Sequence, residues 1–321
     1  MGQFLSCDWG TTSFRIRLAD TRDGKILAEA EAGQGMADTF DLWQQHRNSG
    51  NKQKRQFYLK VIDGHIKKLE SKLNTPLSGV KLIISGMASS SIGFIQIPYN
   101  EAPLPVNGSG IKTAIIPASA DFDHNVMIIS GVKTDDDIMR GEETQLIGYI
   151  NRPVNDELFI FPGTHSKHVR VKDDQIVSFK TYMTGEFFAL LSQKSILKSA
   201  VEASTWYGEK DLSSFKTGVE DSLSENLLHS VFRVRINHLF SRFTGPENFW
   251  YLSGLLIGME LKDLKAAKTG IVNLTGGGQL TPWYQQALEI WGISHRVLPG
   301  SIDEATVKGQ LKIARQTNTF I

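Results

Sequence analysis

The chain has 321 residues, of which 40% are hydrophobic, and its 35 basic side chains nearly balance its 34 acidic ones. This length predicts two domains, and the apolar content suffices for two cores. A net charge near +1 gives no electrostatic reason to expect nucleic acid as a partner. No apolar run approaches the roughly 18 residues of a membrane span, and the single cysteine, Cys7, excludes an intramolecular disulfide. We therefore expect a cytoplasmic protein without a membrane partner.

A strand–turn–strand segment is predicted at residues 4–18, which read FLSCDWGTTSFRIRL. Asp8 ends the first β-run, and Gly10, Thr11 and Thr12 form the turn. A glycine followed by hydroxyl side chains between two strands presents N–H and O–H donors to one anionic group. Asp8 adds a carboxylate suited to hold the waters of a magnesium ion. The segment therefore predicts a phosphate-binding hairpin with a metal-linked aspartate.

A polar loop is predicted to follow the strand at residues 80–85. It begins GMASSSIGF and continues through Tyr99 to several prolines, so that Gly86, Met87, Ser89 and Tyr99 lie on one stiffened segment. Hydroxyl-rich ligands need many short polar donors and acceptors, which this loop supplies. A plain Ser/Pro loop explains the composition equally well. Both interpretations stay open from the residues alone.

A helix is predicted over residues 139–150, MRGEETQLIGYI. Glu142 and Glu143 lie in its first turn, where the helix dipole favours negative charge, so dipole compensation alone explains them. This helix, however, directly precedes the next phosphate-type strand, and Arg140 lies beside the acidic pair. We therefore keep a functional role for the two glutamates open beside dipole compensation and treat Arg140 as a candidate ligand for an anionic substrate.

The pattern of the first hairpin recurs at residues 159–179, FIFPGTHSKHVRVKDDQIVSF. The turn and the start of the next strand place backbone, hydroxyl, imidazole and ammonium groups in one run: Gly163, Thr164, His165, Ser166 and Lys167. Taken alone, the segment is equally typical of an ordinary polar turn. Two such hairpins in order favour phosphate binding. A serine hydrolase is disfavoured, because no Gly-x-Ser-x-Gly elbow occurs.

Helices, loops and a further strand are predicted in the rest of the chain. Helices are predicted at 57–73, 187–197, 223–240, 247–261 and 303–314, a loop at 206–217, and a solvated loop or a fraying helix end at 44–54. A strand at 271–274 leads into Gly276, Gly277 and Gly278. Three glycines after a strand let the backbone lie against a flat base or ribose, where any Cβ would clash. We also expect the last helix, 303–314, to return to the first domain.

The ordered pair of hairpins resembles the layout of the superfamily of acetate and sugar kinases, heat-shock chaperone ATPases and actin. That resemblance implies an α/β, two-domain ribonuclease H-like actin/sugar-kinase (ASKHA) fold with an ATP cleft between domains 1–150 and 151–321. In glycerol and xylulose kinases a Gly-Asp-Gln-Gln segment opens the helix before the second hairpin, and its aspartate is the catalytic base. Here Gly141-Glu142-Glu143-Thr144 occupies that place. The resemblance implies that Glu142 is the base, but which glutamate faces the cleft stays open.

Several segments are more closely similar to the 2-dehydro-3-deoxygalactonokinase family: DWGTTSFR, GMASSSIGF, MRGEETQLIG, FPGTHSKHV, YMTGEFFALLSQKSIL and LTGGGQL. This resemblance implies Mg²⁺-dependent transfer of phosphate from ATP to the 6-hydroxyl of 2-dehydro-3-deoxy-D-galactonate in galactonate catabolism. The superfamily resemblance implies that residues 276–278 bind adenosine. The alternatives are a kinase for another keto-deoxy sugar acid, such as 2-dehydro-3-deoxygluconate, and an actin-like ATPase or exopolyphosphatase without a sugar acceptor. The C4 stereochemistry of the acceptor and the oligomeric state stay open, and we allow for a homodimer.

Overall fold

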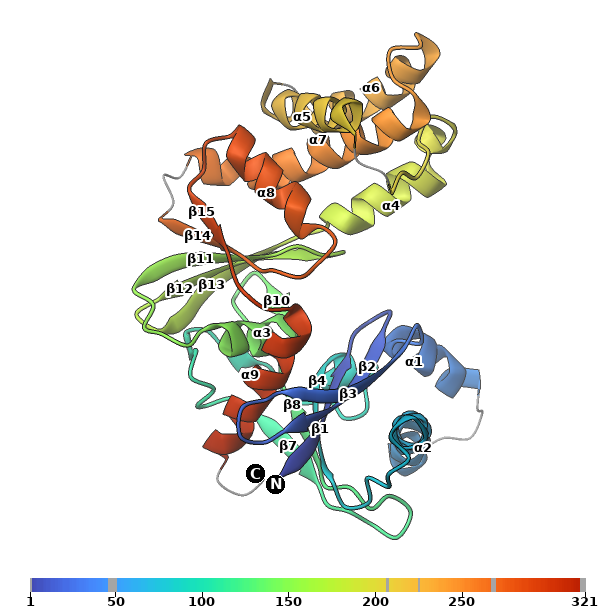
Figure 1. The fold of residues 1–321 in the computed structure, drawn as a ribbon, viewed down its shortest axis with the longest axis vertical. Helices are drawn as coiled ribbons and strands as arrows, with labels where there is room; N and C mark the ends of the chain where they lie inside the picture. Colours follow the sequence, from blue (N-terminus) through green and yellow to red (C-terminus); the bar gives the residue numbers. More distant parts are fainter. Residues whose placement is uncertain (1, 46–50, 206–207, 225, 267–269, 318–321) are drawn as a thin grey trace. The chain divides into compact units, whose positions relative to one another are not determined.

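The computed structural model describes residues 2–45, 51–205, 208–224, 226–266 and 270–317. The chain separates into two compact units (Figure 1). Unit 1 comprises residues 1–155, 172–178 and 300–321, and unit 2 comprises residues 156–171 and 179–299. The division after residue 155 lies close to the predicted one after residue 150. The C-terminal helix α9 (Ile302–Gln316) belongs to unit 1, as we expected from the sequence.

Unit 1 is built on a mixed sheet with the strand order β3-β2-β1-β4-β8-β7. Its strands are β1 (Gln3–Trp9), β2 (Phe14–Asp20), β3 (Ile26–Ala32), β4 (Lys81–Gly86), β7 (Thr113–Ile116) and β8 (Val126–Ile129). The first three form an antiparallel meander, whereas β4 runs parallel to β1 and β8 runs parallel to β4. Asp8 and Gly86 therefore lie at the same edge of the sheet, because parallel strands end on the same side.

Helices cover the two faces of this sheet. Alternate residues of β1, including Leu5 and Trp9, pack into the core that α1 (Met36–Gln45) and α2 (Asn51–Leu73) help to form. On the other face, Gln310 of α9 donates to the carbonyl oxygen of Cys7 and to the hydroxyl of Ser85, each at 2.9 Å. The period of two along β1 places Asp8 on this second face.

Helix α3 (Glu142–Tyr149) packs against α9 at very short range. A Cβ added at Gly148 would lie 1.8 Å from the carbonyl oxygen of Ala305, and one added at Gly309 would lie 1.9 Å from that of Thr144. Only glycine permits this approach. Since α9 also contacts β1 and β4, the close packing holds the first turn of α3 against the sheet edge that carries Asp8.

Short elements complete unit 1. They are η1 (Met87–Ser89), β5 (Asn100–Glu101), β6 (Leu104–Pro105), β9 (Val132–Lys133) and β10 (Ile138–Met139). Strand β9 pairs with both β10 and β5, so Tyr99, next to β5, and Arg140, next to β10, are brought together on one small sheet. Strand β6 pairs with Gln175 and Ile176.

Unit 2 contains a second sheet with the strand order β15-β14-β11-β12-β13. Its strands are β11 (Asp156–Phe161), β12 (Ser166–Lys172), β13 (Gln175–Tyr182), β14 (Ile271–Leu274) and β15 (His295–Val297). Strands β11, β14 and β15 are parallel. The glycine turns that follow β11 and β14 therefore emerge at the same edge, as the pairing of Ile160 with Leu274 requires.

Five helices pack beyond this sheet: α4 (Thr184–Lys194), α5 (Glu209–Ser224), α6 (Leu227–Leu239), α7 (Gly245–Ala266) and α8 (Thr281–Ile290). Figure 1 shows α8 between the sheet and the layer formed by α5, α6 and α7. Glycines let α5 and α7 approach closely, since a Cβ at Gly254 would lie 2.1 Å from the carbonyl oxygen of Phe215. Gly258 of α7 likewise lies against α5, since a Cβ there would lie 2.5 Å from the hydroxyl oxygen of Ser222.

Two predictions for the segment from residue 206 to 240 are wrong. The expected loop at 206–217 is the first half of α5 from Glu209 onward, while residues 206 and 207 lie outside the described residues. Its buried face carries small residues such as Ser214, Gly218 and Ser222 beside Phe215, which hid the helical period from a count of apolar residues. The expected helix at 223–240 is present, but its predicted start is wrong: α6 begins after Asn226, whose side chain caps it by accepting from the N–H of Leu228 at 2.9 Å.

Within the described residues, no helix is long and apolar enough to cross a membrane. Of the expected loop or fraying helix end at 44–54, residues 44 and 45 end α1 and residues 51–54 begin α2, while residues 46–50 lie outside the described residues.

Candidate active site

Asp8 lies at the end of β1 with its side chain only 12% exposed. Burial raises the pKa of Asp8, the positive charges of Arg17 and Arg15 lower it, and the carboxylates of Asp303 and Glu142 raise it again. One carboxylate oxygen is 3.9 Å from a guanidinium nitrogen of Arg15. Buried Arg17, opposite Ser6 on the neighbouring strand β2, pairs with Asp303 of α9 at 2.5 Å. Burial and the two nearby carboxylates outweigh the arginines and leave the pKa of Asp8 raised, so a cation or a proton that reaches this carboxylate stabilises it.

The turn after Asp8 keeps its hydroxyl groups accessible. The Gly10 N–H donates to the carbonyl oxygen of Ser13 at 2.9 Å and closes the turn. Thr11 and Thr12 are exposed, and the carbonyl oxygen of Thr11 accepts from the N–H of Ala37 in α1 at 3.1 Å. The predicted first hairpin therefore exists, and its open side presents two threonines beside Asp8.

Gly86 and Gly141 meet next to Asp8. Gly86 ends β4 with φ +85°, and a Cβ there would lie 2.6 Å from the carbonyl oxygen of Trp9 and 3.3 Å from a carboxylate oxygen of Asp8. Gly141, with φ +119°, precedes α3, and a Cβ on it would lie 3.6 Å from the Cα of Gly86. Both positions favour glycine because a side chain would have to adopt positive φ. The strand ends and the start of α3 thus converge in unit 1.

Arg140 lies between the predicted substrate loop and helix α3. Its guanidinium group donates to the hydroxyl of Ser89 and stacks 4.1 Å from the ring centre of Tyr99. The Nε of Arg140 is buried and makes no hydrogen bond within the described part of the chain. Ser89 is fully buried, and Met87 of the same 3₁₀ turn is half-buried. An anionic ligand would supply the acceptor that this donor lacks.

The two glutamates at the start of α3 have different surroundings. Glu142 is half-buried, and one of its carboxylate oxygens accepts from the N–H of Arg140 at 3.1 Å. Glu143 is 1% exposed and accepts from the N–H of Gly141 at 2.8 Å and from the hydroxyl of Thr144 at 2.9 Å. Burial, together with the charge of Glu142, raises the pKa of Glu143 to about 7. Glu142 is the carboxylate that a ligand can reach.

In unit 2, the turn between β11 and β12 packs against the start of α4. A Cβ at Gly185 would lie 2.8 Å from both the carbonyl oxygen of Gly163 and the Cα of Thr164. Thr164 and His165 are exposed, and Nε2 of His165 lies 2.5 Å from a carboxylate oxygen of Glu186. The turn backbone and the N-terminus of α4 therefore form one donor-rich corner, which suits an anion.

Ser166 and Lys167 do not share this exposure. Ser166 is fully buried and donates its hydroxyl to Glu260 at 2.6 Å, while Lys167 is 6% exposed with its Nζ 3.4 Å from the carbonyl oxygen of His165. A hydroxyl that is already bonded to a buried carboxylate is not available to a ligand. This geometry makes the Ser166 hydroxyl part of the support for the turn and argues against its predicted contact with phosphate, which stays untested.

A cavity of about 570 Å³ opens beside this corner within unit 2. Its lining includes Gly163, Gly185, Gln279 and Leu280, and so joins the first turn to the segment that directly follows Gly276–Gly278. The glycine turn has Gly277 at φ +79°, and Thr281 closes it by donating its hydroxyl to the carbonyl oxygen of Thr275 at 3.0 Å. The size suits a small organic ligand.

Aromatic side chains form the apolar wall of the cavity. The rings of Trp250 and Trp283 lie 3.9 Å apart, and Phe249 contacts Trp250 at 4.9 Å between ring centres. Flat apolar walls of this kind suit a planar ring system. Sequence reasoning missed Trp250 and Trp283, although two tryptophans close to glycine-rich segments were a usable signal.

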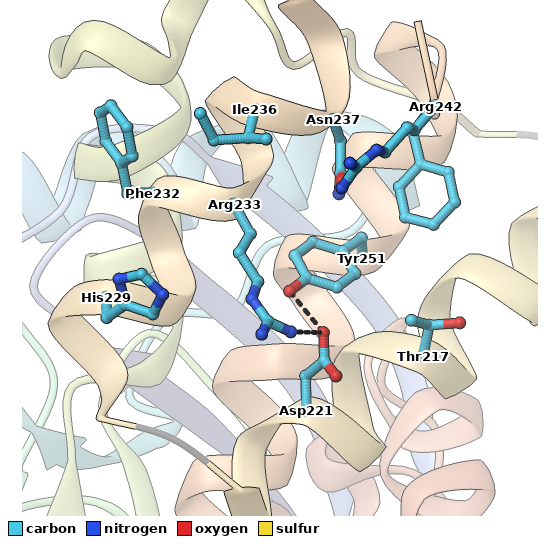
Figure 2. A pocket seen from close by; sticks show the side chains of 10 residues that line it. Thr217, Asp221, His229, Phe232, Arg233, Ile236, Asn237, Arg242 and Tyr251 are labelled. Atoms are coloured by element: carbon cyan, nitrogen blue, oxygen red, sulfur yellow. Dashed lines mark hydrogen bonds and ion pairs between the residues drawn. The ribbon is translucent and has the colours of Figure 1, made fainter. Parts of the chain in front are cut away.

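Another cavity of unit 2, of about 520 Å³, lies among α5, α6 and α7. Figure 2 shows Arg233 and Tyr251 both pointing at Asp221, which they bond at 2.9 and 2.8 Å. None of the residues predicted to bind substrate lines it. The carboxylate of Asp221 is already bonded to Arg233 and Tyr251. The aromatic cavity is therefore the better candidate for a nucleotide site.

Within the described residues, no three His, Cys, Asp or Glu side chains form a metal-binding group. Asp8 and Glu142, which are near enough for the charge of one to raise the pKa of the other, are the carboxylates available at the unit 1 site. Magnesium is commonly bound by one or two carboxylates together with substrate phosphates and waters, so this donor set fits such an ion.

The two α/β units, each with a strand–turn–strand segment at its sheet edge, have the two-domain fold of the sugar kinases and actin. The activator of the 2-hydroxyisocaproyl-CoA dehydratase from Clostridium difficile shares the fold, with a TM-score of 0.50 at 12% identity over 99% of this chain and 96% of that one. The family model for 2-keto-3-deoxy-galactonokinase matches residues 8–313, and the chain belongs to this family.

The names of similar proteins agree with this family assignment. A Rhizobium meliloti protein named "Probable 2-dehydro-3-deoxygalactonokinase" is 33% identical over 98% of this chain and 97% of its own length. The 2-dehydro-3-deoxygalactonokinase of Escherichia coli is 32% identical over 68% of this chain and 74% of its own. A crystal structure from Sinorhizobium meliloti, provisionally given the same name, superposes with a TM-score of 0.79 at 31% identity, covering 97% of this chain and 96% of that one.

Proposed function

We propose that the protein is an ATP-dependent kinase that phosphorylates the 6-hydroxyl of 2-dehydro-3-deoxy-D-galactonate. The observation that carries the mechanism is the convergence, in unit 1, of Asp8, the Gly86–Gly141 contact and the half-buried Glu142 beside Arg140. The names of the relatives support the substrate. Phosphoryl transfer needs mainly positioning and charge neutralisation, and these residues supply both.

Arg140 is the proposed ligand of the sugar-acid carboxylate. Stacking on Tyr99 and bonding to Ser89 fix the guanidinium plane, and the buried Nε has no partner among the described residues. A planar guanidinium group binds a carboxylate through two parallel hydrogen bonds, which also orients the substrate. Gly86 and Met87 line the same loop and are proposed to contact the polyol chain.

Glu142 is the proposed base. In this role it accepts the hydrogen bond of the attacking hydroxyl and so orients the oxygen toward the phosphorus atom. Glu143 is the less suitable group despite its pKa of about 7, because a base must first reach the proton and its side chain is 1% exposed. Asp8 would hold the water shell of Mg²⁺, which would neutralise charge on the phosphates.

The nucleotide is proposed to use the donor groups of both hairpins and the aromatic cavity. Gly10, Thr11 and Thr12 in unit 1, and the turn Gly163–His165 in unit 2, would donate to phosphate oxygens. Gly276, Gly277 and Gly278 would lie against the adenosine, with Trp250 and Trp283 as the wall for the base. We further propose a cytoplasmic enzyme that acts without nucleic acid or membrane.

A panel of sugar acids tests the proposal. Purified protein is given ATP, Mg²⁺ and either the galactonate- or the gluconate-type keto-deoxy acid, and ADP release is followed with and without acceptor. We expect release that depends on the galactonate-type acid. Release without any acceptor would indicate an ATPase, and faster release with the gluconate-type acid would reverse the assignment at C4.

A further inference from the structure

The buried carboxylate of Glu260 is bonded to residues from three segments that surround the aromatic cavity, but Glu260 does not itself line the cavity. Glu260 of α7 is 3% exposed, and four side chains of unit 2 lie within hydrogen-bond distance of its two oxygens. One oxygen lies 2.6 Å from the hydroxyl of Ser166 and 2.8 Å from Nε2 of His168. The other accepts from the hydroxyl of Tyr284 at 2.6 Å and from that of Thr184.

The donors come from the elements that shape the cavity. Ser166 is the first residue after the turn Gly163–His165, and Thr184 opens α4 next to Gly185. Tyr284 belongs to α8, which follows the glycine turn 276–278. Thr184 and Tyr284 line the cavity themselves, whereas Glu260 does not. A substitution at Glu260 can therefore affect a bound ligand only by moving these neighbouring residues.

In this cluster the number of hydrogen-bond donors equals the number of positions at which the carboxylate can accept. An ionised carboxylate accepts about four hydrogen bonds, and Glu260 has four donors around it. Nδ1 of His168 is buried and has no hydrogen-bond partner within the described part of the chain, so Nε2 is the ring nitrogen that faces Glu260. Burial and the charge of Glu260 raise the pKa of Tyr284, so its phenol keeps the proton that it donates.

We propose that Glu260 is a positioning residue for nucleotide binding: its carboxylate fixes the Gly163–Ser166 turn, the start of α4 and Tyr284 in the arrangement that receives the nucleotide. The inference rests on the nucleotide side of the proposed function. It assigns no contact between Glu260 and the ligand. If the Glu260 carboxylate is replaced by an uncharged amide, buried donors that now bond to it would face an NH₂ donor instead. Each buried donor left without an acceptor carries a large desolvation penalty.

The test is Glu260→Gln, which keeps the size of the side chain but replaces one accepting oxygen by an NH₂ donor. We expect the Kd for ADP with Mg²⁺, measured by titration calorimetry, to rise about 10- to 100-fold. The KM for ATP should rise in parallel, and the KM for the sugar acid should stay within about twofold, because Arg140 and its loop belong to unit 1. Mere destabilisation would lower the amount of folded enzyme, and so kcat, without changing the KM for ATP.

Glu157 provides a matched control in the same unit. It is also a buried carboxylate, 8% exposed, and it accepts from Asn273 at 2.9 Å and from Arg296 at 2.5 Å. It lies near the start of β11, at the opposite end of the strand from Gly163. Glu157→Gln should lower the Tm while the Kd for ADP stays within about twofold. Equal losses of ADP affinity in both variants would overturn the assignment.

Ser166→Ala keeps the inference testable if Glu260→Gln fails to fold. It removes one donor and leaves the carboxylate, so we expect a rise of a few-fold in the Kd for ADP. Where both variants fold, their double mutant should lose less than the product of the single losses, since both act on one cluster. Unchanged ADP affinity in folded Glu260→Gln and Ser166→Ala would overturn the positioning role but leave the kinase function intact. Wild-type protein that binds no ADP would overturn both.

Discussion

The two units hold their key carboxylates in opposite ways. In unit 1, Asp8 and Glu142 lie at strand and helix ends and remain partly exposed, and the charge of Glu142 raises the pKa of Asp8. In unit 2, the Glu260 side chain is 1% exposed and has four donors. A partly exposed carboxylate is accessible to a ligand or a proton, whereas a buried one whose hydrogen-bond sites are all occupied supports its neighbours. The contrast predicts that changes in unit 1 lower kcat and changes in unit 2 weaken nucleotide binding.

The largest effect is expected for Glu142→Gln. Loss of the base should lower kcat by about 10² to 10⁴, with little change in the KM for ATP. Glu143→Gln is the matched control on the same helix turn and should be milder, because its carboxylate is enclosed by Gly141 and Thr144. Steady-state kinetics at saturating sugar acid measures both. A greater loss in Glu143→Gln would move the base to the buried position.

Asp8→Asn should lower kcat by about 10² to 10³ at ordinary magnesium concentrations, since it removes charge beside the phosphates. The fold should persist, because asparagine keeps the shape of the side chain. Asp20→Asn is the control: Asp20 ends β2 at the other end of the hairpin and is bonded to Arg22. Kinetics at several magnesium concentrations, with circular dichroism for the fold, checks this. Near-normal kcat for Asp8→Asn would remove the proposed metal role.

Gly277→Val tests the nucleotide side of the comparison. A β-branched residue at φ +79° is strained and would crowd the adenosine side, so we expect the KM for ATP to rise about tenfold or more. The KM for the sugar acid should change little. Gly292→Val is the control, because Gly292 has a similar φ of +65°, an added Cβ would meet no atom within 4 Å, and the residue lies outside the proposed nucleotide site. Equal rises in both Michaelis constants for Gly277→Val would contradict the placement.

The smallest effect on activity is expected from Glu143, whose influence should appear in stability. Burial, with the charge of Glu142, raises the pKa of Glu143 from 4.5 to about 7. Its ionisation therefore costs more in the folded state, so the wild type loses stability as the pH rises from about 4.5 through 7. Glu143→Gln lacks this loss. Thermal melts should show its Tm rising relative to the wild type by about 5 °C or more between pH 5 and pH 8. A constant difference would contradict the raised pKa.

Local patterns in the sequence predicted most of the fold because strand ends and turns have local chemistry. The first hairpin, the strand before Gly86, the strand at 271–274 and the returning helix α9 all form as expected. The failure at α5 has a physical reason: its buried face depends on Gly218 lying against the backbone of Tyr251. A small residue that is buried by close helix packing carries no apolar signal.

By itself, the sequence determined the family, the order of the two hairpins and the glycine turn, because each motif is a short run whose backbone and donor groups act together. Only the tertiary structure decided how single side chains are used. Ser166 looks like a phosphate ligand in the sequence, yet its hydroxyl bonds to Glu260, which lies 94 residues further along the chain. Glu142 and Glu143 are neighbours with the same chemistry, and only packing around α3 leaves one of them accessible. Burial and long-range pairing depend on residues distant in the chain, so no local pattern records them.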